Sequence, residues 1–130
     1  MKKVVIDTNI IIDYLHLRLP EGEKVDFWKI LSQPKIKPLI SAATLQELFI
    51  GKSSKEKKRE QKIRKALLLL RVIKIGEKIA ELAGKILRNN PGKMSFPDAQ
   101  IAATAILEKA QLATGNKKHF NNIKGLKFYA

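Results

Sequence analysis

The chain has 130 residues, of which 45% are hydrophobic, and this is enough apolar material for one folded domain with its own core. It has no cysteine, which excludes disulfides, thiolate metal sites and cysteine nucleophiles. Its net charge of +14 favours a polyanionic partner, above all nucleic acid. No apolar run approaches the ~18 residues that span a bilayer, so we expect one cytoplasmic domain over residues 1–130 without membrane contact.

Short apolar runs alternate with amphipathic segments along the chain. The runs at residues 3–6, 38–41, 72–75, 111–114 and 126–129 predict strands, the last of them at a sheet edge. Helices are predicted over residues 9–17, 23–31, 42–50, 77–88 and 97–107, and a further, highly charged helix follows residue 54. Strands that alternate with helices are joined by right-handed crossovers. The expected fold is therefore α/β: a three-layer α/β/α sandwich around a central parallel sheet.

Several helix starts carry capping signals. Asn9 is a candidate N-cap for the first helix, and Ser95 is one for the helix over residues 97–107. Ser53 and Glu56 have the spacing of a capping box, and Gly51 suits the end of the preceding helix.

Two helices fall between the third and fourth strands, so residues 89–96 must carry the chain back across the domain. Eight extended residues can span ~26 Å, which exceeds the ~18 Å length of a 12-residue helix.

Polar groups gather at one predicted rim of this sheet. Asp7 ends the first strand, Glu47 lies in the second turn of the helix after the second strand, and Asn116 follows the fourth strand. Asp98 starts a helix, and the amino end of a crossover helix faces the carboxyl ends of the strands. The topology therefore brings Asp7, Glu47 and Asp98 together, with Asn116 nearby.

Three carboxylates at one place repel one another at neutral pH, and a divalent cation removes the conflict. Oxygen ligands favour a hard ion, so we expect Mg²⁺ or Mn²⁺ bound by these three carboxylates. Such an ion can bind a phosphodiester oxygen and lower the pKa of a water molecule. An acidic cluster, a hard metal and a cationic protein together indicate a metal-dependent nuclease.

Each acid also has a simpler interpretation. Asp7 could only cap a helix, Glu47 could be a solvated helix residue, and Asp98 could be a favourable charge at a helix start, worth ~0.3–1 kcal/mol. The three simple interpretations together require unrelated carboxylates to fall on one rim by accident. The charged helix beginning near Lys55 is likewise open to two interpretations, a solvated face or an RNA-binding arm, whose candidate contacts are Lys55, Lys58, Arg59 and Lys62.

Four stretches in order make the chain resemble the PIN-domain family, specifically its VapC-type toxin ribonucleases. They are VVIDTNIIIDYL at residues 4–15, ISAATLQELFIG at 40–51, SFPDAQIAATAI at 95–106 and LATGNKKHF at 112–120. The resemblance implies that Asp7, Glu47 and Asp98 are the family's acidic site positions. It places Asn116 at a fourth catalytic position, which is often Asp in the family. Other polar positions around the site are Thr8, Asn9, Ser41 and Thr114.

By the same resemblance, the expected activity is endonucleolytic hydrolysis of RNA by a metal-activated water. The expected partners are RNA, a second copy of the chain in a homodimer, and a protein antitoxin whose tail covers the site. Asn116 in place of Asp leaves open whether a second metal is held or whether this side chain only orients a water or a carboxylate.

Two alternatives compete with this hypothesis. A haloacid-dehalogenase-like phosphatase also has an aspartate after its first strand and a Ser or Thr after its second, as Ser41 would be. Its nucleophile motif requires an acid two residues further on, where this chain has Asn9. The other alternative is an RNA-binding module without catalysis, which the asparagine at position 116 brings into consideration.

Overall fold

A computed structural model describes residues 1–16, 25–50 and 56–130. Its strands are β1 (Lys2–Ile6), β2 (Ile36–Ser41), β3 (Arg71–Ile73) and β4 (Gln111–Ala113). Its α-helices are α1 (Thr8–His16), α2 (Phe27–Leu31), α3 (Ala42–Ile50), α4 (Glu56–Leu67), α5 (Glu77–Asn89) and α6 (Phe96–Leu107), followed by the 3₁₀ helix η1 (Lys117–Phe120). None of the helices in these ranges is both long enough and apolar enough to cross a membrane.

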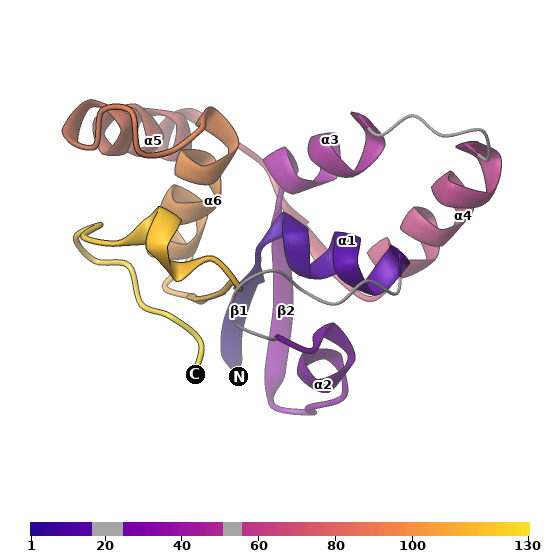
Figure 1. The fold of residues 1–130 in the computed structure, drawn as a ribbon. Coiled ribbons are helices and arrows are strands. Elements are labelled where there is room, and N and C mark those ends of the chain that lie inside the picture. Colours follow the sequence, from indigo (N-terminus) through magenta and orange to yellow (C-terminus); the bar gives the residue numbers. More distant parts are fainter. Residues whose placement is uncertain (17–24, 51–55) are drawn as a thin grey trace.

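The four strands form one parallel sheet in the order β3-β2-β1-β4. Val5 is in register with Leu39 of β2 on one side and with Leu112 of β4 on the other. Figure 1 shows α5 and α6 on one side of β1 and β2, with α1, α2 and α4 on the other. The predicted α/β/α sandwich around a parallel sheet is therefore confirmed.

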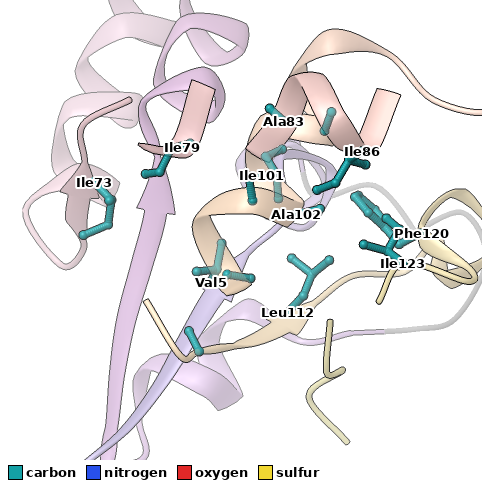
Figure 2. Packing of buried hydrophobic residues seen from close by; sticks show 14 of the residues in the cluster. Val5, Ile73, Ile79, Ala83, Ile86, Ile101, Ala102, Leu112, Phe120 and Ile123 are labelled. Atoms are coloured by element: carbon teal, nitrogen blue, oxygen red, sulfur yellow. The ribbon is translucent and has the colours of Figure 1, made fainter. Parts of the chain in front are cut away.

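The sheet is buried on both faces because successive side chains of a strand point to opposite sides. Val5 belongs to the apolar cluster that includes α5 and α6, whereas Val4 and Ile6 belong to the cluster under α1, α2 and α4. Figure 2 shows Val5 and Leu112 of the sheet beside Ile101 and Ala102 of α6. This double burial explains the continuous apolar run that precedes Asp7.

Helix α6 packs closely on both the sheet and α5. Its buried residues are mostly small, and they are Ala99, Ile101, Ala102, Ala103, Thr104 and Ala105. The helix starts where the sequence predicts, because the Ser95 hydroxyl accepts a hydrogen bond of 3.2 Å from the Asp98 amide. Residues 90–95 connect α5 to α6. The start of α6 is consequently fixed next to the carboxyl ends of the strands.

Three details of the sequence-based assignment are wrong. Asn9 is not an N-cap: α1 begins at Thr8, whose amide donates to the Asp7 carboxylate. Helix α2 begins at Phe27, because the Asp26 carboxylate accepts from the Lys29 amide and caps the helix there. Residues 126–129 form a single parallel bridge to Leu112 and no strand, because they follow a tight turn and their backbone hydrogen bonds to β4 are made with Leu112 alone. The predicted cap signals of Gly51 and Ser53 lie outside the described residues.

Candidate active site

Asp7 is the centre of the candidate site, at the carboxyl end of the central strand β1. Its side chain is buried, and the residue is only 4% exposed. The Thr8 amide donates to Oδ1 at 2.8 Å, and the Thr114 hydroxyl donates to Oδ2 at 2.7 Å. The Asp7 amide donates in turn to the Ala113 carbonyl of β4 at 2.9 Å. The carboxylate is therefore held in one orientation by the first amide of α1 and by a hydroxyl just after β4, while the backbone of Asp7 is bonded to β4.

The pKa of Asp7 depends on its burial and on the groups that surround it. Burial is the largest influence and raises the pKa of Asp7 from 3.8 to about 6. The hydrogen bond from Thr114 and that from the Thr8 amide lower this pKa, whereas the charges of Asp98 and Glu47 raise it further. Both other predicted acids are thus near enough to Asp7 to disfavour its ionised form.

Glu47 reaches the site from α3 and is tied to the start of α1. The Thr8 hydroxyl donates a hydrogen bond of 2.7 Å to Glu47 Oε1. The same hydroxyl lies 2.9 Å from the hydroxyl of Thr44, which is completely buried. Thr44 and Glu47 are three residues apart in α3 and so share one face of that helix. This contact explains how a half-buried glutamate is directed toward the end of β1.

Thr44 is the residue that the sequence reasoning missed. Its only signal in the sequence is its position three residues before Glu47. The other predicted polar positions differ in their surroundings. Ser41 is buried and its hydroxyl accepts from the Ala43 amide at 3.1 Å, which turns the end of β2 into α3. Asn9 is exposed and is the second residue of α1, and the hydrogen bonds that tie α1 to Asp7 and Glu47 are made by Thr8 instead.

Asn116 is connected to Asp7 by hydrogen bonds through the hydroxyl of Thr114. The backbone amide of Asn116 donates to the Thr114 hydroxyl at 3.0 Å, and that hydroxyl donates to the Asp7 carboxylate. Asn116 is half-buried and immediately precedes η1. The segment that follows β4 therefore contributes one hydroxyl and one carboxamide-bearing residue to this end of the sheet.

A divalent cation fits the chemistry of these residues. The donor atoms are carboxylate, hydroxyl and carboxamide oxygens, which hard cations prefer. The charges that act most strongly on buried Asp7 are negative, so a cation there would relieve an unfavourable interaction. Within the parts of the chain that the structure describes, no three His, Asp or Glu side chains are placed closely enough to hold a metal ion as they stand.

The cationic helix α4 covers the same face of the sheet as α1. Lys58 and Lys62 are exposed, Arg59 is half-buried, and Lys55 lies outside the described residues. Ile63 and Ala66 are buried and attach this helix to the core. The helix is thus a packed element with one strongly basic outer side.

A cavity of about 670 Å³ lies at the opposite edge of the sheet. It is lined by residues at the starts of β1 and β4, among them Lys2, Lys3 and Gln111. None of the predicted site residues lines it. The acids therefore lie at the other rim, where the strands end.

Comparison with known proteins identifies the family. The PIN domain family model matches residues 4–126. Ribonuclease VapC1 from Methanocaldococcus jannaschii is 35% identical over 98% of this chain and 87% of its own length. The structure of VapBC2 from Rickettsia felis, bound to a DNA fragment from its promoter, superposes with a TM-score of 0.83 at 26% identity, covering 98% of this chain and 97% of that one. A toxin-antitoxin complex from Klebsiella pneumoniae gives a TM-score of 0.72 at 32% identity, covering 95% and 94%. On this sequence match and this fold, the chain is a member of the PIN-domain family and is similar throughout its length to the VapC-type ribonucleases.

Proposed function

We propose that this chain is a metal-dependent endoribonuclease and the toxin of a toxin–antitoxin pair. The observation that carries the proposal is the placement of Asp98 and Glu47 where their charges raise the pKa of the buried Asp7 carboxyl. Such a cluster of carboxylates provides ligands for a hard cation. In a protein that binds no cation, the same carboxylates would repel one another and lower the stability of the fold. In this proposal residues 1–130 act as one nuclease domain.

Asp7, Glu47 and Asp98 would hold the ion, which we propose to be Mg²⁺ or Mn²⁺. When bound, such an ion neutralises the phosphodiester and makes a nearby water more acidic. Thr114 and the Thr8 amide hold the Asp7 carboxylate in place. The Thr8 hydroxyl holds Glu47. Asn116 is the group at this rim that can accept a hydrogen bond from the attacking water or donate one to a phosphate oxygen.

RNA is the proposed substrate because a net charge of +14 attracts a polyanion to an otherwise acidic rim. A protein antitoxin is the proposed partner, since the structural relatives include VapBC and other toxin-antitoxin complexes. The chain has hydrophobic surface for such contacts: Trp28 is 58% exposed and Leu68 is 85% exposed. We also propose a homodimer and a cytoplasmic location.

The proposal is tested with single-stranded RNA and the purified chain. We expect cleavage in Mg²⁺ or Mn²⁺, none in EDTA, and at least a 100-fold lower rate for Asp7→Asn. Glu81→Gln is the matched control because it removes an equally charged side chain from the exposed surface of α5. It is expected to cleave like the wild type.

The same experiment separates the alternatives. Cleavage by Asp7→Asn at the wild-type rate, with contaminating nuclease excluded, would disprove the proposed metal site. RNA binding without cleavage in any divalent metal would favour the non-catalytic module. Without a cation, however, the acids around Asp7 repel phosphates, so an RNA-binding role alone gives no reason for their gathering.

A further inference from the structure

Two carboxylates of the candidate site each accept a hydrogen bond from a threonine hydroxyl that is itself bonded to a third group. The Thr114 hydroxyl donates to Asp7 Oδ2 at 2.7 Å and accepts from the backbone amide of Asn116 at 3.0 Å. A backbone amide can only donate, so the Asn116 amide occupies the Thr114 oxygen and leaves the hydroxyl proton of Thr114 for Asp7. The direction of this chain of hydrogen bonds is therefore fixed.

The second chain has a buried side chain in the place of that amide. The Thr8 hydroxyl lies 2.7 Å from Glu47 Oε1 and 2.9 Å from the hydroxyl of Thr44. A threonine hydroxyl has one proton and an ionised carboxylate can only accept, so the proton of Thr8 goes to Glu47. The proton between the two hydroxyls is then supplied by Thr44. The order of donation is consequently Thr44 to Thr8 to Glu47.

The surroundings of Thr44 suit this role. Thr44 is completely buried and Thr8 is only 4% exposed, so bulk water does not compete for either hydroxyl. Among the residues that the structure describes, the Thr44 hydroxyl bonds to no group other than Thr8. Thr104 in α6 is equally buried, but its hydroxyl donates at 2.7 Å to the Gln100 carbonyl of its own helix, as helical threonines commonly do. Thr44 instead directs its hydroxyl out of α3 and toward α1.

We propose that Thr44 is a positioning residue of the metal site, whose hydroxyl donates to Thr8 and so keeps the Thr8 proton on Glu47. The inference rests on the proposed ribonuclease function and adds a residue that acts one hydrogen bond behind Thr8. Hydrogen bonds in a buried chain polarise one another, so a donor to Thr8 strengthens the bond from Thr8 to Glu47. Without that donor, the Thr8 oxygen is a buried acceptor that has lost its partner, and the Thr8 hydroxyl has a less defined orientation. Glu47 is then held less firmly as a ligand.

The test measures the Mn²⁺ affinity of the full chain by calorimetric titration. Thr44→Val removes the hydroxyl and keeps the shape of the side chain, whereas Thr44→Ser keeps the hydroxyl. We expect Thr44→Val to bind Mn²⁺ roughly 3- to 10-fold more weakly, which is less than the 10- to 100-fold typical of a group that bonds to a ligand directly. Thr44→Ser should bind it nearly as well as the wild type. Thr104→Val removes the hydroxyl of an equally buried helical threonine, and this matched control should bind Mn²⁺ like the wild type.

A double variant separates positioning from a general disturbance of the fold. If Thr44 acts through Thr8, adding Thr44→Val to Thr8→Val lowers the Mn²⁺ affinity no further. A general disturbance would instead lower the affinity by the same factor with and without the Thr8 hydroxyl.

The possible outcomes distinguish the inference from the function on which it rests. Equal Mn²⁺ affinities of Thr44→Val and the wild type would overturn the inference, and so would the same loss from Thr44→Val in both backgrounds. Neither result would change the metal-dependent cleavage by the wild type that supports the ribonuclease. A wild-type chain that neither binds Mn²⁺ nor cleaves RNA would overturn the proposed function and this inference with it.

Discussion

The Thr8 hydroxyl donates a hydrogen bond of 2.7 Å to Glu47 Oε1, and this bond joins the start of α1 to the middle of α3. It links two of the proposed ligands, because the amide of the same threonine donates to Asp7 at 2.8 Å. Thr8 thus holds both carboxylates in one arrangement before any ion binds. Groups of this kind, which orient ligands without touching the ion, commonly change metal affinity by about 10- to 100-fold when removed.

We therefore expect Thr8→Val to weaken Mn²⁺ binding about 10- to 100-fold and to lower the cleavage rate at limiting metal. Valine keeps the shape of threonine but cannot donate to Glu47. Thr8→Ser keeps the hydroxyl and is expected to bind the metal nearly as well as the wild type. Calorimetric titration of the three proteins measures the effect, and equal affinities would show that the Thr8 hydroxyl does not position Glu47.

The raised pKa of Asp7 predicts how stability depends on pH in the absence of metal. The folded chain holds the Asp7 proton more tightly than the unfolded chain, with pKa values of about 6 and 3.8. The stabilisation is therefore complete below pH 3.8 and is lost as the pH rises through 6. A difference of this size corresponds to roughly 3 kcal/mol.

Asp7→Asn removes the charge and should remove this pH dependence. In EDTA, we expect the variant to be more stable than the wild type at pH 7 by up to about 3 kcal/mol, with the difference shrinking toward pH 4. Urea unfolding at several pH values measures it, and saturating Mn²⁺ should narrow the difference at pH 7 by stabilising only the wild type. Parallel stability curves for the two proteins from pH 4 to 7 would contradict the burial of a charged Asp7.

A substitution at position 116 is predicted to strengthen metal binding, whereas Thr8→Val is predicted to weaken it. Asn116→Asp adds a carboxylate next to Thr114, whose hydroxyl bonds to both the Asn116 amide and Asp7. We expect tighter Mn²⁺ binding, by about tenfold or more, and lower stability in EDTA at pH 7, because another negative charge faces Asp7. Asn121→Asp, an exposed position just after η1, makes the same change in net charge and is the control. If both variants bind Mn²⁺ alike, position 116 is not part of the metal site.

The rim was predictable from the sequence because topology alone places it. Asp7 follows a run of β-branched residues, and Asp98 follows a helix start, so a parallel sheet brings both to one edge whatever the details of packing. The charges of Asp98 and Glu47 both act on Asp7 and raise its pKa, which agrees with this placement. The order of strands and helices was therefore sufficient to predict the rim.

The finer contacts were not predictable, for physical reasons. Thr44 is a threonine inside a predicted helix with no further signal in the sequence, and only the fold places its hydroxyl 2.9 Å from that of Thr8. Asparagine and aspartate are about equally common at helix starts, so the sequence does not choose between Asn9 and Asp7, and α1 begins at Thr8 because Asp7 accepts from its amide.

The basic side of α4 gives the last prediction. Lys58 and Lys62 are exposed and four residues apart, so they lie on one face of the helix. If this face holds the RNA backbone, Lys58→Gln with Lys62→Gln should reduce the salt dependence of RNA binding by about 1.4 in log–log slope, since each phosphate contact on a single strand contributes about 0.7. Lys74→Gln with Lys78→Gln has the same spacing in the sequence and the same charge change; Lys74 directly follows β3 and Lys78 lies in the first turn of α5, which is on the other side of the sheet (Figure 1). This double variant should leave the slope unchanged. Equal slopes for the two double variants would mean that α4 is only a solvated surface and that the protein attracts RNA through its overall charge.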